Sequence, residues 1–508
     1  MKIKTLSLTD FRAFPGPAPT QFDLDGKNLL VYGENGSGKS SLFHALQGLF
    51  SRGKPSDLLT MRNSFSDADM GCVKVSIDFD DQSSTAWHVS GSGALQRYGD
   101  PLLQGPIAVS VHPGHSQPLN ANVTEAAKFS AVLDYRSLLN TNFKHGDGEI
   151  NLFQLAVDGF LAGYLDLASN KTIAQLWLDV QASIPVRATL AAKGRCFERC
   201  QAFNNAMVNA LALLKVEAQA ILQTLSPNGL ELQDLSFKKV AFNNASARGD
   251  KGFINKAIGL EIAYRGITLE RPQHYLNEAR QSAIGLALYL GARLACAPQT
   301  TSHLKLLVLD DVLVSLDHSN RLPVLNVLID LFPNWQVVLL THDKGWFDLA
   351  RQRLPSDDWT SYEIYEGDPA ATAPMPVVRK TENRPAKALL AKGRDLLAQG
   401  YVEAAANYTR QAFEYGLRKG CEIQKVPMNY TVDPTAHQAQ DFLDALKKAP
   451  KPGPVAHADW TTCLQRIEMF KNIVMNPYSH PSAPNIPRQE VVDAAAAVGR
   501  FLELVGKK

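Results

Sequence analysis

Hydrophobic residues in the first part of the chain follow patterns typical of β-strands. Residues 2–8 and 28–33 alternate or run apolar, and the second of these runs leads directly into a glycine-rich loop. Two more strand-like runs lie at 73–79 and 107–112. We therefore expect the chain to begin with several short strands.

Between about residues 151 and 225 the pattern changes, and apolar residues recur at spacings of three and four. This spacing places them on one face of a helix, so the region is predicted to be helical. It is only some tens of residues long, and Ile184-Pro185 and Gly194 are possible breaks. We expect a short antiparallel arm, which excludes a long coiled coil able to span DNA.

Strand character returns at 235–242 and 257–269, and a helix is expected from about residue 276. A continuous apolar strand at 304–310, a further helix and a strand at 335–343 follow. This alternation of strands and helices predicts a mostly parallel α/β sheet.

Residues 367–386 are rich in Pro and Ala and have no periodicity, as expected of an extended linker. After it, residues 387–508 carry apolar residues at helical spacing, ending with the helix expected at 491–505. The sequence therefore predicts a separate, small all-α C-terminal domain.

Composition fits a multi-domain globular protein, because 508 residues with 45% hydrophobic content can form several cores. Lys plus Arg number 52 against 50 Asp plus Glu, so any nucleic-acid surface must be a local patch. The six cysteines lack zinc-ligand spacing, and Cys196 and Cys200 are expected to pack in a core. With no signal-peptide pattern and no run of about 20 apolar residues, we expect a cytoplasmic protein without membrane association.

Residues 33–40, GENGSGKS, fit the phosphate-binding pattern GxxxxGK[ST] between an expected strand and an expected helix. In such a loop the glycines let backbone N–H groups point at a β-phosphate, and the helix N-terminus adds positive potential. Lys39 would bridge the phosphates and Ser40 would bind Mg²⁺. The motif predicts a nucleoside triphosphate and Mg²⁺ as ligands.

Two carboxylates end the apolar strand at 304–310. Asp310 is expected to reach the magnesium held by Ser40, and Asp311 to orient or deprotonate an attacking water. A buried strand that ended in two unpaired carboxylates would be costly without a cation. Asp317 and His342 then follow in order, each in a short polar segment, and complete a series typical of a hydrolytic nucleotide site.

The order of these motifs closely resembles the ABC ATPase heads of SMC, Rad50 and RecF proteins over roughly residues 1–365. The resemblance implies an α/β head with lobe I at 1–150, a short helical arm insertion at 151–225 and lobe II at 226–366. It implies ATP hydrolysis with Lys39, Asp311 and His342 as catalytic residues, and Asp317 as the D-loop residue. Its implied ATP-binding residues are Arg12, Gly33, Asn35, Gly36, Ser37, Gly38, Lys39, Ser40 and Ser41, with Ser40 and Asp310 as metal ligands.

Residues 275–281 are similar to the family's signature motif, although Asn277 stands for Ser and Ala279 for Gly. In that family the signature of one head completes the nucleotide site of another, which here would use Asn277, Glu278 and Ala279 in trans. The resemblance thus implies a homo-oligomer, a dimer of heads or a multiple of it, held together by ATP. A Q-loop residue cannot be named; the segment from Leu133 occupies about the expected place.

A compact head with a short arm and an all-α tail resembles the SMC-like ATPases of bacterial anti-phage defence, such as Septu PtuA and PARIS. That resemblance implies regulation or scaffolding of a separately encoded nuclease or toxin. The tail also resembles HEPN domains, but Arg466 is too far from His480 for the usual ribonuclease motif and Asn476 takes the nearer position, so we expect it to be non-catalytic.

Two alternatives stay open at this point: an ABC ATPase fused to a HEPN-like ribonuclease of the anticodon-nuclease type, and a RecF-like DNA repair ATPase. The repair alternative needs a basic groove for DNA or RNA. Candidate residues for such a groove are Lys193, Arg195, Arg199, Lys238 and Lys239.

Overall fold

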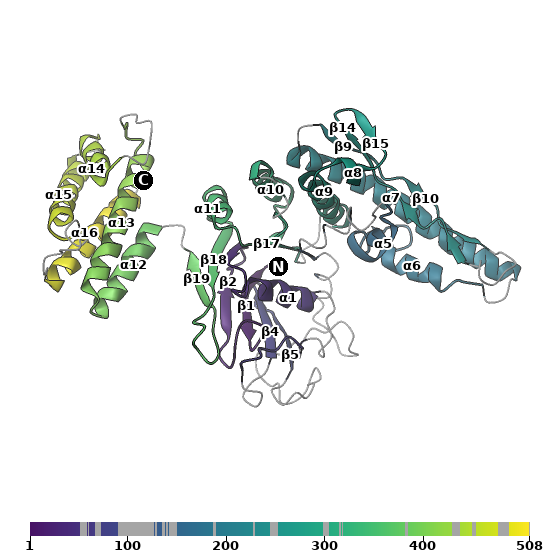
Figure 1. Cartoon of the computed structure of the whole chain (residues 1–508), viewed down its shortest axis with the longest axis horizontal. Helices are drawn as coiled ribbons and strands as arrows, with labels where there is room; N and C mark the ends of the chain where they lie inside the picture. Colours follow the sequence, from purple (N-terminus) through teal and green to yellow (C-terminus); the bar gives the residue numbers. More distant parts are fainter. Residues whose placement is uncertain are drawn as a thin grey trace. The chain divides into compact units, whose positions relative to one another are not determined.

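The computed structural model of the chain divides into two compact units, Met1–Lys380 and Thr381–Lys508 (Figure 1). The boundary between them falls within the predicted linker 367–386. The structure describes residues 1–50, 58, 60–66, 73–89, 126, 130–134, 138, 141, 150–185, 189–226, 229–243, 252–297, 304–313, 316, 318–381, 385–428, 437–449, 454–475 and 487–506. The strand expected at 107–112 lies outside these residues.

A six-stranded sheet forms the centre of the first unit, with the strand order β19-β18-β3-β17-β16-β6. The four pairings among β18, β3, β17, β16 and β6 are parallel, as predicted from the alternation of strands and helices. The strands are β3 (Asn28–Gly33), β6 (Ala131–Asp134), β16 (Leu306–Asp310), β17 (Gln336–Thr341), β18 (Trp359–Tyr365) and β19 (Val377–Thr381).

Side chains of the central strands are buried on both faces of this sheet. In β16, Leu306 and Val308 belong to one core, whereas Leu307 and Leu309 belong to the other. Successive residues of a strand point to opposite faces, so a continuous apolar run is what a doubly covered strand requires. Burial on both faces holds the register of the sheet and the positions of its strand ends.

A second, antiparallel sheet and the helix α1 (Lys39–Phe50) share the first of these cores. This sheet has the strand order β2-β1-β4-β5. Its strands are β1 (Ile3–Thr9), β2 (Thr20–Asp23), β4 (Val73–Phe79) and β5 (Ser84–Val89). The strands predicted at 2–8 and 73–79 are therefore β1 and β4.

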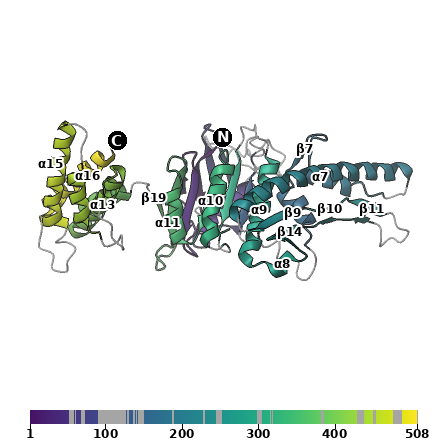
Figure 2. The ribbon, with the colours of Figure 1, turned by 90° about the horizontal axis from the view of Figure 1, so that it is seen from above.

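The other core joins the central sheet to the helices that follow in the chain. α6 runs alongside α7 (Figure 1), and β10 and β11 lie beside the same long helix (Figure 2). The helical elements of this part are α5 (Phe153–Leu155), η3 (Ala156–Phe160), α6 (Ile173–Gln181), α7 (Leu190–Leu225), α8 (Pro272–Tyr275), α9 (Glu278–Cys296), α10 (His318–Leu331) and α11 (Lys344–Arg353).

Short strands accompany the helical arm. β15-β14-β9 form a three-stranded sheet, and β10-β13, β11-β12 and β7-β8 form two-stranded pairs. They are β7 (Leu165–Asp166), β8 (Lys171–Thr172), β9 (Leu230–Asp234), β10 (Phe237–Lys238), β11 (Ala241–Asn243), β12 (Gly252–Ile254), β13 (Ala257–Ile258), β14 (Glu261–Tyr264) and β15 (Ile267–Leu269).

Two details of the sequence-based organisation are wrong. Gly194 does not break the arm, because α7 runs without interruption from Leu190 to Leu225. A single glycine costs a helix only about 1 kcal/mol, which the packing of α7 offsets. The segment 367–386 is not a linker throughout either, because Val377–Thr381 form β19 and join β18 at the edge of the central sheet.

Beyond the end of β19, the second unit consists of helices packed around one apolar core, and no strand occurs among its described residues from 385 onward. Its elements are α12 (Pro385–Ala398), α13 (Val402–Ile423), α14 (Ala439–Lys448), α15 (Pro454–Phe470), η6 (Lys471–Met475) and α16 (Arg488–Gly506). The predicted fold class is confirmed: an α/β P-loop head with a helical arm, together with an all-α C-terminal part. No helix in the described ranges is both long and apolar enough to cross a membrane.

Candidate nucleotide-binding site

The predicted phosphate loop connects β3 to α1 at the carboxyl end of the central sheet. Gly36 and Gly38 have φ angles of 89° and 99°, which favour glycine. At Gly38 a Cβ atom would also lie 2.8 Å from the Cβ of Ala13. The loop can therefore curl over the N-terminus of α1 only with glycine at this position, and it presents Lys39 and Ser40 at the start of the helix.

Asp310 ends β16, and Asp134 ends the neighbouring strand β6 in the same register, directly opposite it. Burial, followed by repulsion from the Asp311 carboxylate, raises the pKa of Asp310 to about 6, and Asp134 adds to the increase. Lys39 and His342 act in the opposite direction and do not offset it. The strand ends thus gather carboxylates around a buried acid whose charged form needs a cation.

Asp311 connects the phosphate loop to the segment that follows β17. Its Oδ2 atom forms an ion pair with Lys39 Nζ, and its Oδ1 atom accepts a hydrogen bond from the backbone N–H of His342 at 3.0 Å. The same Oδ1 lies 2.9 Å from His342 Nδ1. Asp311 has a φ of 51°, an unusual backbone angle for a residue other than glycine. Of the three predicted catalytic residues, Asp311 therefore contacts both Lys39 and His342.

The residue after His342, Asp343, is held by contacts with two helices. The Asp343 side chain accepts a hydrogen bond from the backbone N–H of Trp346 at 2.9 Å and so caps the N-terminus of α11. Arg321 of α10 binds the same carboxylate at 2.5 Å and donates to the carbonyl of Leu316 at 3.0 Å. Leu316 belongs to the predicted D-loop, but Asp317 itself lies outside the described residues.

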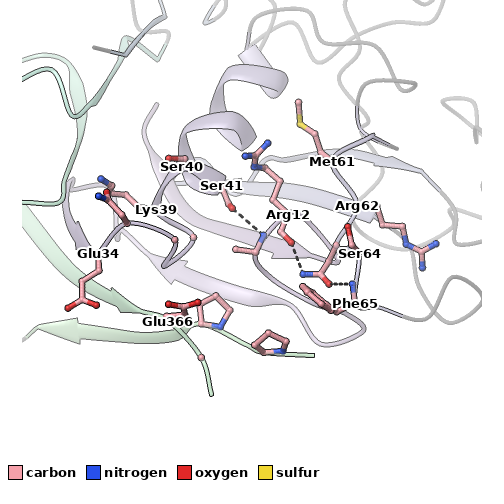
Figure 3. Close-up of a pocket in the computed structure, with 18 of the residues that line it drawn as sticks. Arg12, Glu34, Lys39, Ser40, Ser41, Met61, Arg62, Ser64, Phe65 and Glu366 are labelled. Atoms are coloured by element: carbon pink, nitrogen blue, oxygen red, sulfur yellow. Dashed lines mark hydrogen bonds between the residues drawn. The ribbon is translucent and has the colours of Figure 1, made fainter. Parts of the chain in front are cut away.

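The turn after β1 packs against the phosphate loop from the other side. The backbone N–H of Ala13 donates to Ser41 Oγ at 3.3 Å, and that of Arg12 donates to the carbonyl of Met61 at 2.7 Å. Burial lowers the pKa of the Arg12 guanidinium. Arg12 faces the same cavity as the phosphate loop, as predicted for a nucleotide-approaching arginine (Figure 3).

These residues surround a cavity of about 610 Å³ (Figure 3). Lys39, Ser40, Arg12 and Asp311 line it, together with the segment 60–65. Cavities of this size are typical of small-molecule sites. The residues present also fit a magnesium ion, because Asp310 Oδ1 is buried without a hydrogen-bond partner in the described part of the chain. Asp310 and Ser40 would hold that ion.

The predicted signature residues lie at the N-terminus of α9. Asn277 is the N-cap, and its side chain accepts a hydrogen bond from the backbone N–H of Arg280 at 3.1 Å. Asn277 and Glu278 are exposed, whereas Ala279 is buried. The N-terminus of α9 therefore lies at the surface beside Asn277 and Glu278.

The candidate basic residues for nucleic acid are only partly brought together. Lys193 and Lys239 line one groove of the arm, next to Cys196 and Cys200. Arg199 instead donates to the carbonyl of Asp179 at 2.9 Å. Asn476 and His480 of the tail lie outside the described residues.

Two parts of the site were missed by sequence reasoning. Asp134 belongs to the segment expected to carry the Q-loop, and a short apolar strand ending in a carboxylate was the available signal. Glu366, Gly367, Pro374 and Pro376 line the cavity, although the last three belong to the segment 367–386 that was predicted to be a linker. Nothing local in their sequence marks them as part of a site.

Comparison with known proteins supports a nucleotide-binding domain at this place. Residues 5–97, which include the whole phosphate loop, match a family model described as an AAA domain. No curated protein matches the chain.

Solved structures with a similar fold include RecF with ATP in the RecFOR pathway, at 13% identity over 75% of this chain and 98% of the other, with a TM-score of 0.43. An SMC head bound to the C-terminal winged-helix domain of ScpA is similar at 13% identity, over 76% of this chain and 100% of the other, with a TM-score of 0.41. The SMC head domain from Thermotoga maritima is similar at 14% identity, over 75% of this chain and 100% of the other, with a TM-score of 0.39. Among these comparisons, the match to a family model is the one to the AAA domain over residues 5–97.

Proposed function

We propose that this chain binds ATP with Mg²⁺ and hydrolyses the γ-phosphate bond. One observation carries the proposal: the segments after β3, β16 and β17 bring Lys39 and His342 into contact with Asp311, and Lys39 and Asp311 line one cavity. These residues are far apart in sequence, and an ordinary structural ion pair would not require a glycine-rich phosphate loop beside it.

In the proposed reaction the backbone N–H groups of residues 36–40 and the Lys39 ammonium bind the phosphates. Asp310 and Ser40 would hold the metal ion, which would supply positive charge to offset the negative charge of the phosphates. Asp311 orients the attacking water and accepts its proton. Because Asp311 pairs with Lys39, a triphosphate must first compete with this carboxylate for the lysine.

His342 receives its orientation from Asp311. An ionised carboxylate can only accept hydrogen bonds, so the ring nitrogen next to Asp311 must be the one that carries a proton. The other ring nitrogen, Nε2, then remains available to a γ-phosphate or to the attacking water.

We further propose that two copies of the chain close around two ATP molecules. The exposed N-terminus of α9, with Asn277, Glu278 and Ala279, would approach the γ-phosphate bound by the partner, and Asp317 would lie at the same seam. The positive end of the dipole of that helix suits a phosphate. Glu278 is negatively charged, so approach through the backbone and the Asn277 amide is favoured over approach through the carboxylate.

The biological role that we propose for this ATP-dependent dimer is control or scaffolding of a separately encoded nuclease or toxin in bacterial anti-phage defence. Support comes from the layout of the chain, a head with a short arm followed by a separate helical unit that can serve as a docking module. A RecF-like repair role is the second candidate, and the observation that favours it is the pair Lys193 and Lys239 on one arm groove.

Hydrolysis is tested by measuring phosphate release from purified wild-type, Lys39→Ala and Asp311→Asn proteins at saturating Mg²⁺. We expect turnover in the wild type and its loss in both variants. Turnover at the wild-type rate in either variant would remove the catalytic assignment. The exposed Glu231→Ala serves as the matched control, because it alters a carboxylate of the arm and leaves the site intact.

Dimer formation is tested with Asp311→Asn, which should keep ATP bound without turnover. Its mass in solution should double with Mg-ATP and return to the monomer value with ADP. A mass that ignores the nucleotide contradicts the clamp. Protection of cells against phage, abolished by Lys39→Ala, would support the defence role, whereas salt-dependent DNA binding that Lys193→Ala and Lys239→Ala weaken would support the repair role.

A further inference from the structure

The connection between β18 and β19, residues 366–376, lies against the phosphate loop; we name it the pocket strap. β18 is paired with β3 so that Ile364 lies opposite Gly33, the first residue of the phosphate loop. The strap begins two residues after Ile364. The register of the central sheet therefore places the start of the strap near the start of the phosphate loop.

Contacts hold the strap to the loop and to itself. Pro376 is buried, and its Cγ atom lies 3.5 Å from where a Cβ on Gly38 would be. Gly367 lies against the backbone of Met375, because a Cβ at position 367 would come within 2.3 Å of the Met375 carbonyl oxygen. The two ends of the strap thus touch each other, and one of them touches the phosphate loop.

β19 anchors the far end of the strap on the head. Lys380 Nζ donates to the carbonyl of Asp23 at 3.1 Å and lies 3.4 Å from Asp25 Oδ2. Within the strap, Asp368 accepts a hydrogen bond from the backbone N–H of Ala370 at 2.9 Å and stabilises a turn. The strap is a closed, internally bonded segment rather than an extended linker.

The strap provides one wall of the cavity through Glu366, Gly367, Pro374 and Pro376. A facing part of the lining comes from the segment 60–65. There, the buried Asn63 donates to the carbonyl of Arg12 at 2.6 Å and accepts from the backbone N–H of Phe65 at 2.8 Å. Phe65 is held in this way at the cavity with 62% of its surface exposed.

A nucleotide in this cavity has two chemically different halves. The triphosphate requires the N–H groups and cations of the loop around Lys39, so the nucleoside must extend into the remaining space, which the strap and the segment 60–65 border. Proline rings and Phe65 offer apolar faces to a base or a sugar. Glu366 is exposed and has no hydrogen-bond partner in the described part of the chain, and its carboxylate accepts hydrogen bonds but would repel phosphates.

We propose that the pocket strap is the ribose-binding element of the site, with Glu366 accepting hydrogen bonds from the ribose hydroxyls and Pro374 packing on the nucleoside. This inference rests on the proposed binding of ATP. A carboxylate is suited to a pair of sugar hydroxyls, because these groups donate hydrogen bonds and carry no charge.

The test measures dissociation constants for Mg-ATP, for Mg-2′,3′-dideoxy-ATP and for inorganic triphosphate, in the wild type and in Glu366→Ala. In Glu366→Ala we expect ATP to bind about tenfold or more weakly, as for loss of a charge-assisted hydrogen bond. Wild-type protein should bind the dideoxy analogue more weakly than ATP by a similar factor. The variant should bind the dideoxy analogue and ATP with equal affinity. Triphosphate should bind the variant as tightly as the wild type, or more tightly.

Equal ATP affinity in wild type and Glu366→Ala overturns the ribose contact but leaves the proposed ATPase intact, since the wild type still binds ATP. If Glu366→Ala weakens the binding of ATP and of triphosphate by the same factor, the ribose contact is also overturned, because the effect would then not depend on the sugar. If the wild type binds neither ATP nor triphosphate, the proposed function fails and this inference fails with it. Glu231→Ala is the control and should bind all three compounds as the wild type does.

Discussion

Asp311 holds His342 at two points: its Oδ1 accepts the His342 backbone N–H at 3.0 Å and lies 2.9 Å from His342 Nδ1. The other carboxylate oxygen pairs with Lys39. One side chain therefore fixes both the orientation and the tautomer of the histidine, while occupying the lysine that phosphates need. This relationship couples nucleotide binding to the arrangement of the groups proposed to catalyse hydrolysis.

Replacing Asp311 by Asn should separate binding from hydrolysis. The amide cannot accept a proton from water, so the rate of phosphate release is expected to fall by about 10²–10⁴-fold. The affinity for Mg-ATP should stay the same or increase, because Lys39 loses a competing anion. Parallel measurements of turnover and of equilibrium ATP binding check both parts; weaker ATP binding together with normal turnover would contradict them.

Gly38→Ala should strongly weaken nucleotide binding. The substitution forces a side chain onto a φ of 99° and brings its Cβ to 2.8 Å from that of Ala13, so the phosphate loop must shift. We expect the dissociation constant for Mg-ATP to rise at least about tenfold, because a left-handed backbone alone costs an L-residue about 1–2 kcal/mol. Isothermal titration with ATP measures the change.

Gly400→Ala is the matched control for backbone strain. Gly400 has a φ of 90°, but nothing lies within 4 Å of the place that an alanine methyl group would occupy, and it belongs to the second unit. This variant should lower thermal stability slightly and leave ATP affinity unchanged. Equal ATP affinities for Gly38→Ala and wild type would show that the loop tolerates a side chain there.

Metal-dependent activity should decline as the pH falls through about 6. The pKa of Asp310 is raised to about 6, so its carboxyl becomes protonated below that pH and loses its affinity for a cation. Higher Mg²⁺ concentration should move the decline to lower pH, because the cation favours the ionised form. A pH profile of turnover at two Mg²⁺ concentrations checks this; a decline at the same pH in both would argue against Asp310 as a ligand.

The same raised pKa affects stability in a definite direction. The folded state favours the neutral carboxyl, so this contribution to stability is complete below the unfolded pKa near 3.8 and is lost as the pH rises through about 6. Asp310→Asn should therefore raise the free energy of unfolding at pH 7.5 without Mg²⁺, on the order of 1–3 kcal/mol. At pH 4 the difference from the wild type should nearly vanish.

A pair of glycine substitutions tests the packing of the arm. A Cβ at Gly291 of α9 would lie 2.7 Å from the backbone N of Ala218 in α7, so Gly291→Ala must push the helices apart and should cost about 1–3 kcal/mol of stability. Gly194 of α7 has nothing within 4 Å of such a methyl group, so Gly194→Ala should stabilise by up to about 1 kcal/mol. Thermal melting of both variants measures the effects; the same sign for both would contradict the packing described.

Much of the fold and the centre of the site follow from local patterns in the sequence. The apolar run of β16 with its terminal Asp310 is a signal contained within a few residues, as is the loop around Lys39. The same holds for the helical spacing of α13 and α16. Such signals are local because a strand or a phosphate loop is specified mainly by residues adjacent in the chain.

The tertiary structure alone decided which distant residues meet. It placed Asp134 opposite Asp310 and brought Asp311 into contact with both Lys39 and His342. It also made the pocket strap part of the cavity lining. These relationships depend on strand register and on side-chain packing between segments far apart in the chain. No single segment carries that information, because strand register is set by how side chains of several segments are buried against one another.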